Sequence, residues 1–329
     1  MQAERAKIYA IAAKIHAVIG TDPVPTFAAN ALRVIGQPEL TINYLEEGDR
    51  ADEQHAGMGA AGQGEKVGRW GQIDVSLAIK GGGADYSAGA NKPEWDALLR
   101  AAGFSATVSG VGGAGVIMYT TLDSGAFERV ALYCQSANKL YKLIDCIALP
   151  KLNAEAAKRG VFTFTVIGRM STDPAESAFA GQTLSSVAAP AFHSQAISIG
   201  AYATPTVRKL DLDFGTAHTP LPSAGATDGL DGFEITDRDL KLGMEIQVVP
   251  LATFDPYVLG KQAWPGGTDT KVDFQVGAAQ FNRVKFALGQ WAFGTPPNSD
   301  NSGIATWNLQ GRILARSLAS GREITITAD

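Results

Sequence analysis

The stretch from Arg129 to Met170 reads RVALYCQSANKLYKLIDCIALPKLNAEAAKRGVFTFTVIGRM, and a related stretch from Lys271 to Leu314 reads KVDFQVGAAQFNRVKFALGQWAFGTPPNSDNSGIATWNLQGRIL. In each, an apolar run precedes an asparagine, and a second apolar run, a polar segment and a third apolar run follow. Short apolar runs separated by turn residues are typical of strands in an antiparallel sheet. The sequence therefore predicts a β-meander, three strands joined in chain order, that occurs twice.

Two landmarks align these stretches. Asn138 and Asn282 are each followed by a basic residue, are each predicted at a tight turn, and lie 144 residues apart (282 − 138). The Gly-Arg pairs that begin at Gly168 and Gly311 end the third strand and lie 143 residues apart (311 − 168). One deletion reconciles the two offsets, so we interpret the chain as an internal duplication.

Length and composition agree with a duplicated β protein. The 329 residues accommodate two domains of about 140 residues, and 37 glycines with 15 prolines indicate many turns between short elements. We predict a mainly β protein with two tandem β-sandwich or barrel domains, each with a short flanking helix. The predicted boundaries are an N-terminal helix and extended arm at 1–30, a first domain at 31–170, a linker at 171–190 and a second domain at 191–329.

The N-terminal 19 residues place apolar side chains at helical spacing, which predicts a short amphipathic helix or docking arm. Charged residues interrupt this segment, so it lacks the continuous apolar run of a signal peptide or a membrane span, and we expect no membrane association. Two prolines in GTDPVPTFAAN, residues 20–30, favour an extended arm.

The clearest predicted helix is KPEWDALLRAAGF, residues 92–104, with a buried stripe of Trp95, Leu98, Leu99 and Ala102 and a stop at Gly103. TFDPYVLGKQ is its counterpart in the second half. TVRKLDLDF corresponds in the same way to the strand LTINYL, and DLKLGMEIQVVPL corresponds to GQIDVSLAIKGG. The final GREITITAD alternates cleanly and predicts a last strand.

No motif in the chain predicts catalysis or a cofactor. The four histidines lack metal-ligand spacing, and GMGAAG at Gly57–Gly62 lacks the preceding strand and following helix of a dinucleotide fingerprint. Cys134 and Cys146 both lie in strand-like sequence, which predicts two reduced core thiols. We therefore expect no enzyme activity, no cofactor and no metal.

Acidic residues occur in two patterns. Asp74, Asp211, Asp213 and Glu245 alternate with apolar residues along predicted strands, so they point away from the core, either to an ordinary wet face or to the shared inner surface of an assembly. A second group lies in a predicted loop at 46–70, long enough to be functional or mobile. This group comprises Glu46, Glu47, Asp49, Arg50, Asp52 and Glu53.

In the order of these elements, the chain resembles the tail tube proteins of siphophages, in particular the long two-domain type of Mu-like siphophages. GTDPVPTFAANAL, KPEWDALLRAAGFS, the two meander segments NKLYKLIDCIAL and FTFTVIGRM, KLDLDFG, EITDRDLKLGMEIQV with LATFD, and EITITAD carry the resemblance over nearly the whole length. It implies a β-sandwich or barrel fold, rings that stack into a conduit for genomic DNA, and no catalytic residues. It also implies other tail proteins as partners, location in the virion tail and synthesis in the host bacterial cytoplasm.

Several features fit that role. A net charge of −5 argues against a nucleic-acid clamp but suits a lumen that DNA slides past, and the four alternating acids are candidates to line it. Residues 20–30 and 46–70 are candidates to reach an adjacent ring. If the usual ring has six domains, three duplicated chains complete it with pseudo-sixfold symmetry, so we expect a trimeric ring.

A surface-binding module is the main alternative. A two-domain β-sandwich at a tail tip could recognise carbohydrate or a host receptor, and exposed aromatic platforms would favour that function. The five tryptophans instead lie mostly in strand or helix patterns that predict burial; they are Trp70, Trp95, Trp264, Trp291 and Trp307.

Overall fold

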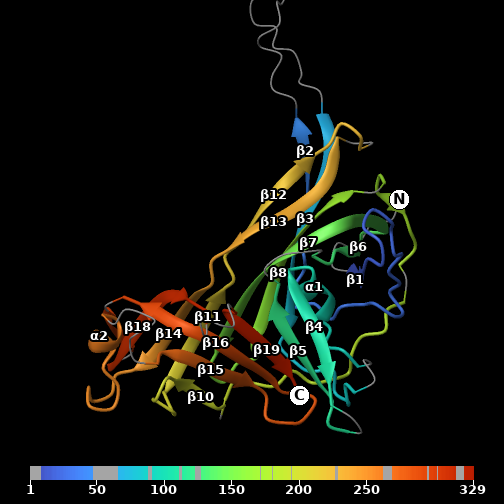
Figure 1. Ribbon diagram of the computed structural model, residues 1–329. Helices are drawn as coiled ribbons and strands as arrows, with labels where there is room; N and C mark the ends of the chain where they lie inside the picture. Colours follow the sequence, from blue (N-terminus) through green and yellow to red (C-terminus); the bar gives the residue numbers. More distant parts are fainter. Residues whose placement is uncertain are drawn as a thin grey trace, which may run out of the picture.

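The computed structural model confirms a mainly β protein, with 53% strand, 3% helix and a large antiparallel sheet. Most strands belong to a long sheet or to a shorter one (Figure 1), and most of the buried apolar side chains form one cluster. The structure describes residues 9–46, 66–87, 91–110, 113–122, 127–170, 172–179, 181–193, 195–226, 229–261, 269–294, 296–301, 303–315 and 322–329.

The elements follow one another in short steps along the chain. The first half contains β1 (Tyr9–Ile15), β2 (Leu40–Glu46), β3 (Lys66–Ala78), α1 (Asp96–Arg100), β4 (Phe104–Ser109), β5 (Val116–Thr121), β6 (Val130–Ser136), β7 (Lys139–Glu155), β8 (Val161–Met170) and β9 (Ala175–Glu176). The second half contains β10 (Ile197–Ile199), β11 (Val207–Asp213), β12 (Thr216–Pro222), β13 (Leu230–Arg238), β14 (Lys241–Gln247), α2 (Pro256–Leu259), β15 (Lys271–Val276), β16 (Val284–Phe293), β17 (Asn298–Asn301), β18 (Ile304–Ile313) and β19 (Ile324–Ala328).

The long sheet runs in the order β2-β3-β8-β7-β11-β14-β18, and every pairing in it is antiparallel. The shorter sheet runs β4-β5-β19-β16-β15-β10. β16 belongs to both, because its first part pairs with β19 and its last part with β18. One buried cluster fills the space between the sheets, with Phe162 of β8 and Phe286 of β16 at a ring-centroid distance of 5.9 Å.

The first predicted meander forms the three-stranded unit β6-β7-β8, the second has an additional strand, β17, between β16 and β18, and their first turns also differ. Between β6 and β7 the chain turns at Ala137 and Asn138, both with positive φ (49° and 58°), as a two-residue hairpin requires. Asn282 instead lies in a seven-residue connection, 277–283, between β15 and β16. A tight turn is present at Asn282 as predicted, since its N–H donates to Ala279 O at 3.1 Å, but the turn lies within this longer connection and its positive φ (60°) falls on Phe281.

The N-terminal helix prediction is wrong for the residues that the structure describes, since 9–15 form β1, which pairs with β6 from Tyr9 opposite Ser136 to Ile15 opposite Val130. Ala10, Ile11, Ala12 and Ala13 are all buried, with alternate residues in two different apolar clusters. A strand covered on both faces loses its period-two signal, and the remaining spacing resembled a helix.

The other predicted elements differ mainly in their ends. Helix α1 is confirmed, with its stripe of Trp95, Leu98, Leu99 and Ala102 fully buried and Gly103 at φ +83° just beyond it. The predicted loop at 46–70 is too long, because β3 begins at Lys66 and pairs there with the end of β2. Residues 47–65 lie outside the described part of the chain.

Candidate functional site

One seam joins the two halves inside the long sheet. The last five residues of β7 pair with β11, from Lys151 opposite Asp213 to Glu155 opposite Lys209. Lys151 Nζ lies 3.0 Å from Asp213 Oδ2, and Asn153 donates a side-chain hydrogen bond to Asp211. Strand pairing of this kind satisfies backbone groups across the boundary, so the sheet continues unbroken from one half into the other.

The predicted acids meet on one face of this sheet. Directly opposed residues of an antiparallel pair share a face, so the register can be followed from strand to strand. Asp74 of β3 is opposite Thr165 of β8, which is opposite Leu149 of β7, and Leu149 lies on the same face of β7 as Lys151. The seam and the pairing of Lys209 with Glu245 continue that face across β11 and β14. Asp74, Asp211, Asp213 and Glu245 therefore share it.

The opposite face of the same strands is apolar. Val75, Leu152, Leu210 and Met244 alternate with the polar residues and are at most 2% exposed. The period-two pattern is thus the reason that the acids and the core separate onto opposite faces.

We had expected an acidic face, but the polar face carries acids that are mostly paired with cations. Asp211 and Asp213 each lie beside a lysine, with Lys209 Nζ 2.7 Å from Asp211 Oδ2. Arg208 Nη1 donates to Glu245 Oε1 at 2.9 Å, whereas Asp74 accepts a hydrogen bond from Thr165. Sequence spacing located the acids but did not pair them with these cations, because Lys151 and Arg208 lie on strands adjacent to those of their partners, Asp213 and Glu245.

A hollow of about 660 Å³ lies over this face where β11, β14 and β18 are adjacent; Lys209, Asp211, Asp213, Lys241, Glu245 and Arg312 are among its lining residues. Asp239 receives hydrogen bonds from Arg312 and from Lys241, and these hold the pKa of its carboxyl below the usual range. The hollow therefore presents paired charges rather than a concentrated field of one sign.

The hairpin of β12 and β13 covers one end of the polar face, where β13 lies against β7 and β8. Leu230, Phe233 and Ile235 of β13 form a second apolar cluster with Ile147 and Ile167. Trp70 of β3 adds an edge-to-face contact with Phe233, with ring centroids 5.5 Å apart. The hairpin occupies the chain position between β11 and β14 that residues 47–65 occupy between β2 and β3.

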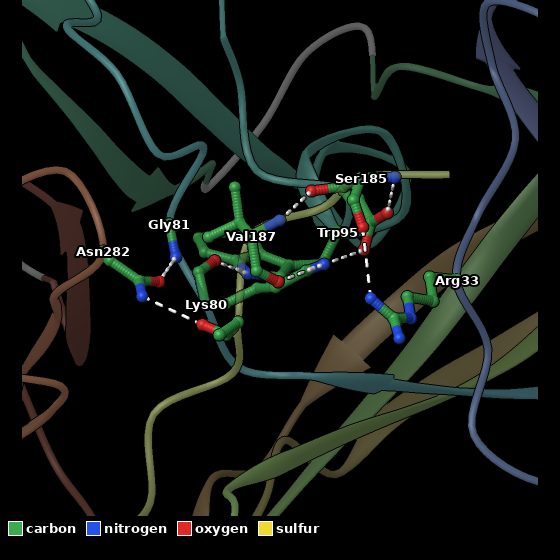
Figure 2. A network of polar contacts seen from close by, with 9 residues as sticks. Arg33, Lys80, Gly81, Trp95, Ser185, Val187 and Asn282 are labelled. Carbon is green, nitrogen blue, oxygen red and sulfur yellow. Dashed lines mark hydrogen bonds and ion pairs between the residues drawn. The ribbon is translucent and has the colours of Figure 1, made fainter. Parts of the chain in front are cut away.

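The segment predicted as a linker, residues 171–190, binds both halves where it is described. Figure 2 shows Lys80 donating to Val187 O at 3.3 Å while Trp95 Nε1 donates to Lys80 O at 2.9 Å. Asn282 from the second half accepts from Gly81 N–H at 3.0 Å and donates to Ala188 O at 2.9 Å (Figure 2). These hydrogen bonds hold the connector, residues 171–190, against the first half through Lys80 and against the second half through Asn282.

A buried polar cluster that sequence spacing did not predict holds the N-terminal segment. His16, whose side chain is fully buried, has Nδ1 at 3.5 Å from Asp145 Oδ1, and its Nε2 accepts from Asp145 N–H. Asp145 also accepts from Arg169 Nε at 2.8 Å and from Gly20 N–H at 2.7 Å. The Asp145 oxygens are thus occupied by structural donors, and the cluster braces β7 against the N-terminal residues.

The extended arm predicted at 20–30, a candidate to reach an adjacent ring, packs on its own chain. Phe27 is 8% exposed and contributes to the apolar cluster of Ala10, Ala12 and Tyr133. The Tyr133 hydroxyl donates to Asp22. Of the predicted inter-ring loop, Glu46 is the last residue of β2, and the other five residues lie outside the described part of the chain; they are Glu47, Asp49, Arg50, Asp52 and Glu53.

The cysteines, the possible metal ligands and the tryptophans do not form a reactive or binding site in the described part of the chain. Cys134 and Cys146 are free and buried, as predicted, and burial raises the pKa of Cys134 to about 11 and that of Cys146 further. Among the described residues, no three His, Cys, Asp or Glu side chains are grouped to hold a metal. Trp95, Trp291 and Trp307 are buried, whereas Trp264 lies outside the described residues.

No protein-family model matches the chain, and no curated protein matches it. No helix within the described residues is long and apolar enough to span a membrane.

Both ends of the long sheet have an edge without a strand partner in the described part of the chain. β2 pairs with β3 on one side, and β17 pairs with β18 on one side. An unpaired edge presents a row of backbone donors and acceptors that another strand can satisfy. The site with functional potential is therefore the polar face together with these two edges.

Proposed function

We infer that this chain is a structural subunit of a phage tail tube, whose copies form rings that stack into the conduit for genomic DNA. The observation that carries this proposal is the seam, where one half of the chain extends the sheet of the other while the polar face continues across it. A protein that joins its own halves in this way, and whose described strands leave an open edge at each end of the sheet, has the parts needed for a ring of sheets.

The pairings also support two copies of one tube domain, at 31–170 and 191–329. Gly71 and Asp74 of β3 are opposite Gly168 and Thr165 of β8. In the second half, Leu242 and Glu245 of β14 are opposite Gly311 and Asn308 of β18, with the same spacing of three residues on each strand. Asp74 and Glu245 then hold equivalent places.

A trimeric ring follows if the seam is repeated between copies. Each copy offers eight strand positions, namely β2, β3, β8, β7, β11, β14, β18 and the pair β16–β17, so three copies give 8 × 3 = 24. Closed barrels of about 16 to 18 strands already enclose aqueous channels. A closed sheet of this size has room for a DNA conduit lined by the polar face.

The paired charges of that face suit the passage of DNA. A cation beside a carboxylate offers a weaker field to a phosphate than an isolated cation does, so a polyanion meets few binding wells along the path. In this proposal, DNA passes without specific binding, other tail proteins contact the ends of the tube, and the protein resides in the virion tail after synthesis in the bacterial cytoplasm.

Electron microscopy of the purified protein at increasing concentration tests the proposal. We expect rings of three copies and stacked tubes. Monomers at every concentration would overturn the assembly function, and monomers with affinity on a glycan array would favour the tail-tip binding module instead. Six copies in each ring would retain the tube but contradict the trimer.

A further inference from the structure

We propose that the outer edge of β2 in one copy pairs antiparallel with the outer edge of β17 in the next copy, with Asn43 opposite Ser299. This inference rests on the proposed function and names the two edges through which copies join. It comes from the seam inside the chain, which is a complete example of the same junction.

β2 holds the place in the first half that β11 holds in the second. Leu40 and Asn43 are opposite Ile73 and Trp70 of β3, three residues apart on each strand. Leu210 and Asp213 are opposite Met244 and Lys241 of β14 with the same spacing. Asp74 and Glu245 are equivalent, so the residues just before them, Ile73 and Met244, are equivalent too. Their partners Leu40 and Leu210 then correspond, and three residues further on Asn43 corresponds to Asp213.

β17 holds the place of the last part of β7. Lys151 is opposite Thr163 of β8, two residues before Thr165. Ser299 is opposite Thr306 of β18, two residues before Asn308, which is equivalent to Thr165. Ser299 therefore stands where Lys151 stands, and the seam pair Asp213–Lys151 becomes Asn43–Ser299 between copies.

Burial gives an independent reason to expect a strand on the open edge of β2. In β11, which has a strand on each side, Leu210 is 0% and Leu212 is 1% exposed. The equivalent Leu40 and Ile42 pack against the same core but remain partly exposed. A strand added along β2 would cover part of this exposed area; in the proposed register β17 reaches Ile42 and ends one residue before the position opposite Leu40.

The chemistry of the two edges fits a second copy of this chain. Asn43 is half-buried, Ser299 is exposed, and neither is charged, so this pair takes no ion out of water; the one charged residue of β17, Asp300, then lies opposite Ile42. The two edges are at opposite ends of one sheet, so the contact is head to tail and can close into a ring.

Paired cysteines test the register directly. Opposed residues of an antiparallel pair lie within the Cα distance that a disulfide spans, whereas positions displaced by two residues lie about 7–8 Å apart. Asn43→Cys with Ser299→Cys should give covalent trimers as the main product on a non-reducing gel after mild oxidation. Thr41→Cys with Ser299→Cys, displaced by two residues, should remain monomeric.

Three controls accompany these variants. Lys151→Cys with Asp213→Cys, the equivalent pair inside the chain, should form a disulfide within one chain, so that the protein still runs as a monomer on the gel. The unsubstituted protein, with buried Cys134 and Cys146, should not cross-link. Thr41→Cys with Asn301→Cys is a second in-register pair in case the first variant fails to fold, as judged by circular dichroism under reducing conditions.

The outcomes separate this inference from the proposed function. Rings or tubes in the microscope with monomers on the gel from both in-register pairs would overturn the edge assignment and leave the tube function standing. Cross-linking of the displaced pair instead would overturn the register. Covalent trimers that never stack into tubes would support the edges and contradict the conduit.

Discussion

In the proposed duplication, β2 and β11 hold equivalent places beside β3 and β14, yet they differ in what lies on their other side. β11 has β7 there and buries Leu210 and Leu212 completely, whereas β2 has no described strand there and leaves Leu40 and Ile42 partly exposed. Two strands with alternating apolar residues thus differ in burial: β11 is an interior strand of the sheet, whereas β2 is an edge strand in the described part of the chain. Burial in this sheet therefore depends on whether a neighbouring strand is present as well as on the alternation of apolar and polar residues.

The largest expected effect comes from truncating the same residue type in both strands. Leu210→Ala should lower the free energy of unfolding by about 2–5 kcal/mol, because it leaves a cavity in a closed part of the core. Leu40→Ala should lower it by about 1 kcal/mol in dispersed chains, since less apolar area is buried there. Urea unfolding at concentrations below assembly measures both, and equal losses would show that β2 needs no partner.

A second comparison concerns Asn138 and Asn282, which the sequence presents as equivalent. Asn282→Gly should lower the free energy of unfolding by about 1–3 kcal/mol, because Gly81 N–H and Ala188 O each lose a hydrogen-bond partner. Asn138→Gly should change it by about 0.5 kcal/mol or less, since glycine accepts the positive φ of that turn.

Thermal unfolding of the two variants at one protein concentration gives this comparison, with the unsubstituted protein as control. Similar losses at the two positions would mean that both asparagines act through their turns, and that the contacts at the connector contribute little.

These pairs show what the sequence could and could not predict. Alternation predicted β3, β11, β14 and β19 and placed Asp74 and Glu245 away from the core, because period two fixes the face of a side chain. It could not predict that β7 continues past its meander to meet β11, since the identity of a neighbouring strand depends on distant backbone. The cations beside the acids, and the brace at Asp145, were missed for the same reason.

The smallest expected effect concerns charge at the seam. Glu155 ends β7 opposite Lys209, and a hydrogen bond from Lys158, 2.8 Å away, lowers the pKa of Glu155, with the charges of Lys158, Arg208 and Lys209 acting in the same direction. A carboxyl with a lowered folded-state pKa stabilises the fold above its unfolded pKa of about 4.3, and that contribution is lost as the pH falls through the folded value.

Carbon-13 NMR titration should therefore find Glu155 ionised at a pH where an unperturbed glutamate is half protonated. Lys158→Met should raise the pKa more than Lys209→Met does, because it removes the hydrogen bond as well as a charge. If Lys209→Met had the larger effect, the charge of Lys209 across the seam would be the main cause of the lowered pKa. The seam would then depend on charges that its proposed counterpart, Asn43 opposite Ser299, does not have.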